Sequence, residues 1–336
     1  MAQMTSYQQD IDKVAQKLAF PPEGNILITG ATGLIGSCLV DILMQHSACH
    51  IYALGRNRER AMQRFKTYEN DSRFHFLQHD VSLPLPFQED FHYIIHAASN
   101  ASPAFFQQTP VEVMKANLNG VCHLVEYGLQ HQMRRMVFIS SGEIYGEGEG
   151  SIFTEESSGY IDILSPRACY PSSKRASETL CAAYAQEYGA DIVIARLCHT
   201  YGPSFTESDN RVYAQFIRNV LQGEDIVMKS KGEQYRSWIY VVDCAAAILT
   251  LLMKGQGGEA YNVADEQSNI TIRQLAEKVA SISGQQVIMD ITVDGNTTPI
   301  TKAVFSTEKI KQLGWKQLFN MDEGLAHTIQ TLRQNR

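Results

Sequence analysis

The chain has 336 residues, 44% of them hydrophobic and 19% charged, a composition typical of a globular protein with more than one core and not of a disordered chain. Its 29 basic and 36 acidic residues give a net charge of −7, which argues against a nucleic-acid partner. No apolar run approaches the roughly 20 residues that span a bilayer, and the first ten residues carry no signal core. The seven cysteines are scattered and never in CxxC spacing. We therefore expect a cytoplasmic protein with reduced thiols, no metal site and no membrane partner.

Short apolar strands alternate with helical segments over the first two thirds of the chain. After a helix over residues 6–20, the pattern predicts strands over residues 25–29, 50–54, 74–77, 93–97, 135–140 and 191–196. Helices are predicted between them over residues 34–44, 58–68, 111–130 and 172–188. Strands rich in Ile and Val that alternate with helices predict an α/β fold, a doubly wound parallel Rossmann sheet covered by helices on both faces.

Beyond residue 200 the alternation ends and loops become more frequent. A helix is predicted over residues 211–220, and residues 238–242 with a helix over 243–253 are expected to return to the main sheet. The pattern over residues 265–336 predicts mixed helices and short strands. We predict two lobes packed against each other. Residues 1–198 and about 236–263 form the Rossmann domain, and residues about 199–235 and 264–336 form a smaller mixed α/β lobe.

A glycine turn, Gly30-x-x-Gly33-x-x-Gly36, joins the first strand to the following helix. In this context the glycines allow a tight turn, close approach of a pyrophosphate and close packing of helix and strand, so the turn predicts a dinucleotide site. The acidic residue expected about 20 residues later, which would bind the adenosine ribose, is missing. Gly55-Arg56-Asn57 stands there instead. Arg56 would either pair with a 2′-phosphate, favouring NADP, or stack on adenine or face solvent. Asp80 would accept a hydrogen bond from the adenine amino group or be a simple turn residue.

A second group of residues predicts acid/base chemistry. Tyr170 and Lys174 stand one helical turn apart at the start of the long predicted helix, so the ammonium is expected to approach the phenol and lower its pKa. Tyr170 would then exchange a proton with a sugar or alcohol hydroxyl. Ser141 and Glu143 directly follow a sheet strand, and we expect both in the same cleft. Ser141 would share a proton with Tyr170, and Glu143 would act either as a base or as a structural carboxylate.

With these motifs the chain resembles the extended short-chain dehydrogenases/reductases that modify nucleotide sugars, and within them it is most similar to the UDP-glucuronate decarboxylases. The resemblance covers roughly residues 22–330. It rests on the glycine turn, His96-Ala-Ala, Ser140-Ser-Gly-Glu-Ile-Tyr-Gly146, Tyr170-x-x-x-Lys174 and Arg196-Leu-Cys-His-Thr-Tyr-Gly-Pro203. The subfamily is suggested by Pro166-Arg-Ala-Cys-Tyr170, Asn210-Arg-Val212, Arg236 with Tyr240-Val-Val-Asp243, and Leu313-Gly-Trp315.

The resemblance implies a reversible hydride cycle on a nucleotide sugar, with a UDP-sugar favoured. Tyr170 would remove the proton of the sugar O4 while hydride leaves C4, and the 4-keto group would then acidify C5 or allow loss of CO2. The cofactor, NAD or NADP, would be tightly bound and recycled. Its predicted site comprises Gly30, Thr32, Gly33, Leu34, Ile35, Gly36, Arg56, Asp80, Val81, Ala97, Ala98, Asn117, Tyr170 and Lys174. The predicted substrate site comprises Ser141, Gly142, His199, Arg211, Val212, Arg236 and Lys302.

Three departures from the family pattern leave the exact reaction open between decarboxylation, epimerisation and dehydration. Gly142 stands where dehydratases carry the acid that protonates a departing 6-hydroxyl and where decarboxylases carry a serine. Lys302 is near the place of an arginine that holds the substrate carboxylate, so it is either a weaker anchor or a solvated lysine. His199 replaces an asparagine, and is either a substrate contact or a satisfied half-buried histidine.

Two other functions compete with this hydride cycle. Arg56 and the missing acid favour a net NADP-dependent reductase of a keto-sugar or another carbonyl. A dinucleotide sensor without catalysis is the other alternative, although such proteins generally lose the tyrosine or the lysine. The resemblance further implies a homodimer with a four-helix interface, here formed by the helices over residues 111–130 and 172–188.

Overall fold

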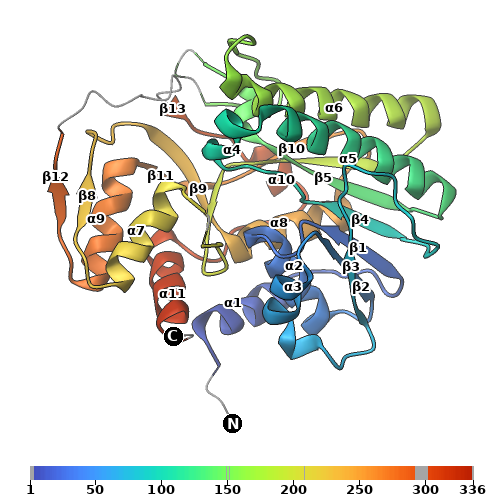
Figure 1. Cartoon of the computed structure of the whole chain (residues 1–336), viewed down its shortest axis with the longest axis horizontal. Coiled ribbons are helices and arrows are strands. Elements are labelled where there is room, and N and C mark those ends of the chain that lie inside the picture. The colour runs from blue at the N-terminus through green and yellow to red at the C-terminus, as the bar shows by residue number, and fades with distance from the viewer. Residues whose placement is uncertain (1–3, 149, 151, 208, 292–301, 335–336) are drawn as a thin grey trace.

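The computed structural model describes residues 4–148, 150, 152–207, 209–291 and 302–334. Its centre is a seven-stranded parallel sheet in the order β10-β6-β5-β4-β1-β2-β3 (Figure 1). The strands are β1 (Asn25–Thr29), β2 (His50–Gly55), β3 (Phe74–Gln78), β4 (Tyr93–His96), β5 (Arg135–Ser141), β6 (Ile192–Leu197) and β10 (Ala260–Val263). The order reverses between β1 and β4, so the predicted doubly wound fold is confirmed, and a ligand crevice is expected at that point.

Helices cover both faces of this sheet. Alternate residues of β1 point to opposite faces: Ile26 and Ile28 pack in one core cluster, and Leu27 packs in a second. The first cluster includes apolar residues of α2 (Leu34–His46) and α8 (Val241–Lys254), and the second includes those of α5 (Pro110–Gln130) and α6 (Cys169–Tyr188). The burial of both faces explains why these strands are almost uniformly apolar in sequence.

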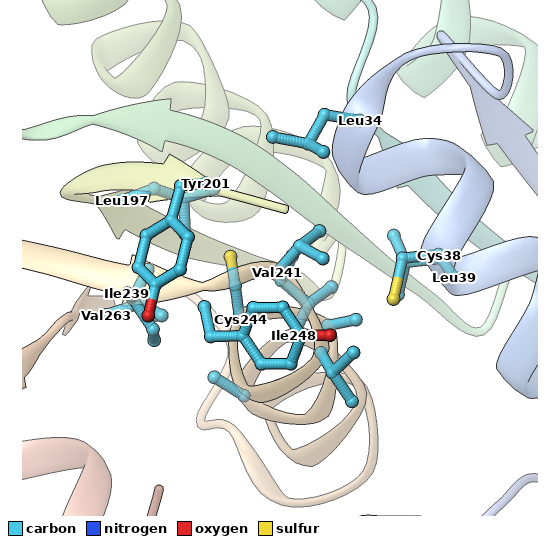
Figure 2. Packing of buried hydrophobic residues seen from close by; sticks show 14 of the residues in the cluster. Leu34, Cys38, Leu39, Leu197, Tyr201, Ile239, Val241, Cys244, Ile248 and Val263 are labelled. Carbon is cyan, nitrogen blue, oxygen red and sulfur yellow. The ribbon is translucent and has the colours of Figure 1, made fainter. Parts of the chain in front are cut away.

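Helix α8 is central to the first cluster, because twelve of its fourteen residues are buried. Figure 2 shows Val241, Cys244 and Ile248 of this helix close to side chains from the neighbouring strands and from α2. Among them are Leu197 of β6, Val263 of β10 and Leu39 of α2. Because this helix is buried on nearly all sides, its residues are almost all apolar. This burial explains the longest apolar run of the sequence, Cys244 to Met253.

The second lobe contains two small sheets. One has the order β11-β9-β13, with β7 also paired to β9, and the other pairs β12 with β8. Their strands are β7 (His199–Tyr201), β8 (Ile226–Met228), β9 (Tyr235–Tyr240), β11 (Asp265–Thr271), β12 (Val287–Met289) and β13 (Lys302–Ala303). The helices are α7 (Val212–Leu221), α9 (Ile272–Ser283), α10 (Glu308–Lys311) and α11 (Met321–Gln334).

The prediction that residues 238–242 return to the main sheet is wrong. They lie largely in β9, which pairs antiparallel with β11, and the chain re-enters the main sheet only at β10, after the crossover helix α8. A short apolar run is compatible with either sheet, so its pattern could not decide between them.

Several predicted helix boundaries also shift. The first helix, α1 (Ser6–Ala15), ends five residues earlier than expected, whereas α6 begins three residues earlier and so includes Tyr170. The short helices α3 (Arg58–Arg64) and α4 (Pro103–Gln108) complete the Rossmann part. Three turns of 3₁₀-helix cover Lys66–Tyr68, Gly142–Tyr145 and Pro166–Ala168.

Candidate active site

A crevice opens at the carboxyl ends of the parallel strands, where the strand order reverses. The glycine turn forms one wall of the crevice. Gly30 has φ +64°, and a Cβ there would lie 2.8 Å from the Ala97 oxygen, while a Cβ at Gly36 would lie 2.3 Å from the Gly30 oxygen. Both positions therefore require glycine. Gly33 is the N-cap of α2 and supplies no side-chain hydrogen bond, so the first N–H groups of α2 remain available for an anion.

The crevice brings together most of the predicted cofactor residues. It is lined by Gly30, Thr32, Gly33, Leu34, Ile35, Gly36, Arg56, Asp80, Val81, Ala97 and Ala98. Asn117 is placed differently, because its side chain is fully buried behind the wall. It accepts a hydrogen bond from Ser99 Oγ at 2.9 Å and donates one to Ser173 Oγ at 2.8 Å. Asn117 thus joins the segment after β4 to α6 and positions the crevice wall. The shape, the glycine cradle and the uncapped helix fit a dinucleotide.

The far end of the crevice, after β2, is rich in arginine. Arg56 lies 3.9 Å from a carboxylate oxygen of Asp80, and Arg60 donates to the Thr32 carbonyl at 2.9 Å. Burial opposes ionisation of Asp80, but hydrogen bonds from Ser82 and the charge of Arg56 outweigh it and lower the pKa of this carboxyl. The side chain of Arg56 is 66% exposed, so it is accessible to a ligand at this end.

Tyr170 occupies the first turn of α6 and is only 6% exposed. Its ring stacks on Phe106 of α4, with 4.8 Å between the ring centroids. Burial raises the pKa of Tyr170 to about 12, and the charge of Glu143 adds to this effect, whereas a hydrogen bond with Ser141 and the charge of Arg211 oppose it. The contact with Ser141 brings together two of the residues predicted to share a proton.

The expectation that Lys174 lowers the pKa of Tyr170 is wrong, because this pKa is raised and Lys174 is not among the groups that influence it. The Lys174 ammonium donates to the Ile139 carbonyl at 2.8 Å and lies 5.9 Å from the Tyr170 ring centroid. It also lies 4.7 Å from the Phe138 ring centroid. Because Lys174 is only 2% exposed, burial lowers its own pKa to about 7. Helical spacing brought the two side chains to one face, but burial is the largest influence on the pKa of each.

Glu143 is held by an arginine whose role the sequence did not reveal. Arg167 donates to both carboxylate oxygens of Glu143, at 2.9 and 3.1 Å. The side chains of Arg167 and Glu143 are 32% and 24% exposed, so this bidentate pair is partly desolvated. In the sequence, Arg167 is part of the motif that ends at Tyr170. Local sequence does not indicate that its side chain contacts a carboxylate 24 positions upstream.

The predicted substrate residues Arg211 and Arg236 lie close enough to His199 to influence its pKa. Burial lowers the pKa of His199 to about 3, and the charges of Arg236, Arg211 and Arg167 contribute in that order. His199 is therefore neutral at physiological pH, and its buried Nδ1 makes no hydrogen bond to the described part of the chain. Burial likewise lowers the pKa of Arg236 to about 10, against the charge of Glu143. Arg211 pairs with Asp209, and both line the crevice, while Val212 begins α7.

Gly142 and Lys302, which depart from the family pattern, have different surroundings. A Cβ at Gly142 would come within 2.2 Å of Phe305 Cζ, so the ring of Phe305 fills the space that a side chain there would need. Phe305 is 3% exposed and was not singled out in the sequence. Lys302 pairs in β13 with Tyr235 of β9 and donates its ammonium to the Gly150 carbonyl at 2.7 Å.

A dinucleotide crevice at the switch point of a parallel sheet, with a tyrosine and a lysine on one helix beside it, defines a nicotinamide-dependent enzyme. Residues 26–264 match the NAD dependent epimerase/dehydratase family, and the chain belongs to this family. A UDP-glucuronic acid decarboxylase 1 from Xenopus tropicalis is 31% identical over 312 residues, covering 92% of this chain and 72% of that protein. UDP-glucuronic acid decarboxylase 6 from Arabidopsis thaliana is 31% identical over 91% of this chain and 88% of its own length.

Solved structures agree with this assignment. A UDP-glucose 4-epimerase from Thermotoga maritima, solved with UDP-glucose, has a TM-score of 0.79 at 25% identity and covers 93% of this chain and 99% of that one. Within the part of the chain that the structure describes, no group of three or more His, Cys, Asp or Glu residues could hold a metal ion. In the same residues no helix combines the length and apolarity that crossing a membrane requires.

Proposed function

We propose that this protein modifies a nucleotide-linked sugar through a 4-keto intermediate formed by reversible hydride transfer at C4. The proposal is supported by the interaction of Tyr170 with Ser141, Glu143 and Arg211, of which Arg211 lines the dinucleotide crevice. The Lys174 ammonium lies 5.9 Å from the Tyr170 ring centroid. A bound nicotinamide ring would accept the hydride from C4 and return it. The relatives named for UDP-glucuronic acid favour a UDP-sugar as the substrate.

Each residue of the site would have a separate role. Tyr170 would receive the proton of the sugar O4, with Ser141 hydrogen-bonded to it. Lys174 would hold the nicotinamide ribose. Glu143, oriented by Arg167, would serve as the base toward C5. The smaller lobe, predicted to comprise residues about 199–235 and 264–336, would bind the nucleotide sugar through Arg211. Arg236 of β9, at the predicted domain boundary, would act with it, because planar guanidinium groups suit a diphosphate.

Among the three reactions, the packing at Gly142 argues against dehydration. A departing hydroxyl needs an acid to protonate it, and Phe305 leaves no room for such a side chain at position 142. The same packing leaves no room for the serine that decarboxylases carry at this position, whereas epimerisation at C5 needs neither group. His199, uncharged and without a partner at Nδ1 among the described residues, would hydrogen-bond to the sugar nucleotide.

The decisive experiment incubates the purified protein with a panel of UDP-, dTDP-, GDP- and CDP-sugars in heavy water and weighs the products by mass spectrometry. Loss of CO2 identifies decarboxylation, loss of water identifies dehydration, and gain of one deuterium alone identifies epimerisation at C5. If no sugar of the panel changes while the protein still binds the dinucleotide, the proposed function is wrong.

A second candidate is a net NADP-dependent reductase, which the exposed Arg56 and the absence of an acid at Gly55 favour. The two functions differ in stoichiometry, because a reductase consumes one NADPH for each product and the proposed cycle consumes none. Absorbance of reduced nicotinamide during turnover distinguishes them.

We further infer a homodimer through a four-helix interface of α5 and α6, and a location in the cytoplasm. The dimer is supported by the exposed apolar residues Val111, Met114 and Leu129 on α5 and Tyr188 on α6. A reducing compartment agrees with the seven cysteines, all of which are free thiols.

A further inference from the structure

A cavity of about 230 Å³ lies away from the dinucleotide crevice, and none of its lining residues is shared with that crevice. It is enclosed by α1, by α8 and by the segment between α10 and α11. Figure 1 shows α1 close to α8, below the main sheet. Val14 of α1 and the residues that follow it, Lys17 to Ala19, form one side of the cavity.

The interior of the cavity is apolar. Val14 and Leu18 from the first segment, Ala246 and Met253 from α8, and Trp315 line it. An engineered apolar cavity of about 150 Å³ accommodates benzene, so this larger space accommodates an aromatic ring or a short alkyl chain. The indole N–H of Trp315 is buried without an acceptor in the described residues, which leaves an unused donor in the wall.

The rim of the cavity is basic. Lys17, Lys254 and Lys316 line it, and all three are exposed residues. Lys254 donates to the Leu313 carbonyl at 3.2 Å, which fixes its ammonium beside Gly314. The one acidic residue in the lining is Asp243, whose two carboxylate oxygens accept hydrogen bonds from the backbone N–H groups of Leu318 and Phe319. The acid is thus engaged within the protein, and the lysines determine the charge at the mouth.

We propose that this cavity binds a small organic anion, a carboxylate with an aromatic or short aliphatic body. The apolar body would occupy the space between Val14, Ala246 and Trp315, where it is removed from water. The carboxylate would lie at the mouth, within reach of the lysine ammonium groups. This site is independent of the proposed reaction, because it shares no residue with the site of that chemistry.

The test compares three probes with the same body: 4-phenylbutyrate, 4-phenylbutanol and 4-phenylbutylamine. Calorimetry on the full-length protein should show the carboxylate binding about tenfold more tightly than the amine, with the alcohol between them. Fluorescence of Trp315 should change on binding, and this change should disappear in Trp315→Phe.

Variants then locate the site. Lys316→Glu and Lys17→Glu should each weaken phenylbutyrate about fivefold, whereas Lys66→Glu, the same change at an exposed lysine elsewhere, should not. Ala246→Phe should fill the cavity and abolish binding; if that variant does not fold, the lysine variants decide. The proposal is overturned if phenylbutyrate does not bind, if the amine binds equally well, or if both rim variants bind as the wild type does.

Discussion

The phenol of Tyr170 is protonated at neutral pH in the protein without ligands, because its burial raises its pKa to about 12. The neighbours that favour the phenolate are Ser141, through a hydrogen bond, and Arg211, through its charge. Lys174 is itself a weakened cation with a pKa of about 7. Burial and the charge of Glu143 thus outweigh the two neighbours that favour the phenolate.

Substitution of Tyr170 by phenylalanine tests its role as the proton acceptor. Tyr170→Phe should lower turnover by about 10²- to 10⁴-fold, since it removes the hydroxyl that exchanges the proton. It keeps the ring that stacks on Phe106, so the midpoint of thermal unfolding should change little. Tyr160→Phe, at a tyrosine that is 65% exposed, is the matched control and should retain full activity. Undiminished turnover in Tyr170→Phe would exclude the mechanism.

A second residue-scale prediction concerns the acidity of the same phenol. The negative charge of Glu143 raises the pKa of Tyr170, so Glu143→Gln should move this pKa downward from about 12. The phenolate would then form at a lower pH than in the wild type. NMR of protein labelled at the tyrosine Cζ carbon would follow the titration, with Tyr170→Phe to assign the signal. Glu147→Gln, at an exposed residue of the same loop, should leave the pKa in place; an upward shift in Glu143→Gln would contradict the prediction.

At the scale of elements, α1 shows how an N-terminal helix becomes part of the core. A capping box formed by Thr5 and Gln8 begins the helix, and Ile11 and Val14 are almost completely buried. Asp10 on the same helix accepts a hydrogen bond from Tyr240 at 3.1 Å and pairs with His327 of α11 at 2.7 Å. One carboxylate therefore ties α1 to β9 and α11.

Removal of this carboxylate should destabilise the protein measurably. Asp10→Ala should lower the free energy of unfolding by about 2–3 kcal/mol, because it leaves the buried Tyr240 hydroxyl without its acceptor and breaks a pair whose acid is 1% exposed. Asp12→Ala should cost less than about 1 kcal/mol, since the Asp12 side chain is 41% exposed in its contact with His46. Urea unfolding measures the free energy of unfolding of both variants. If both lose the same amount, the buried contacts of Asp10 do not stabilise the protein more than the exposed contact of Asp12.

The elements also show where sequence patterns suffice and where they fail. The strands and helices around the glycine turn followed from local periodicity, because both faces of each strand are buried and each crossover is a helix. The assignment of β9 failed because sheet membership depends on β11, which follows 25 residues after β9 ends. In the site, the proximity of Tyr170 and Lys174 was predictable because they share a helix. The ion pair between Arg167 and Glu143 was not, because it joins residues that folding alone brings together.

On the scale of the whole molecule, the layered architecture leaves one outer face uncovered within the described residues. Helices α5 and α6 pack against each other and against the sheet through buried residues of the second core cluster. The outer side of α5 carries Val111, Met114, Leu118 and Leu129 at helical spacing, with none of them buried. An apolar stripe of this kind on a long helix is a recurrent feature of subunit interfaces.

The dimer proposed above can be tested by placing charges on this stripe. In the double variant Met114→Glu and Leu118→Glu, each subunit would bury two carboxylates in a symmetric interface, so the dissociation constant of the dimer should rise by about a hundredfold or more. Sedimentation velocity at micromolar concentration should then show a monomer, while the wild type sediments as a dimer. Leu83→Glu adds charge at a residue that is 55% exposed and lies outside α5, and it should leave the dimer intact. A wild-type protein that is monomeric under these conditions would show that the stripe serves another purpose.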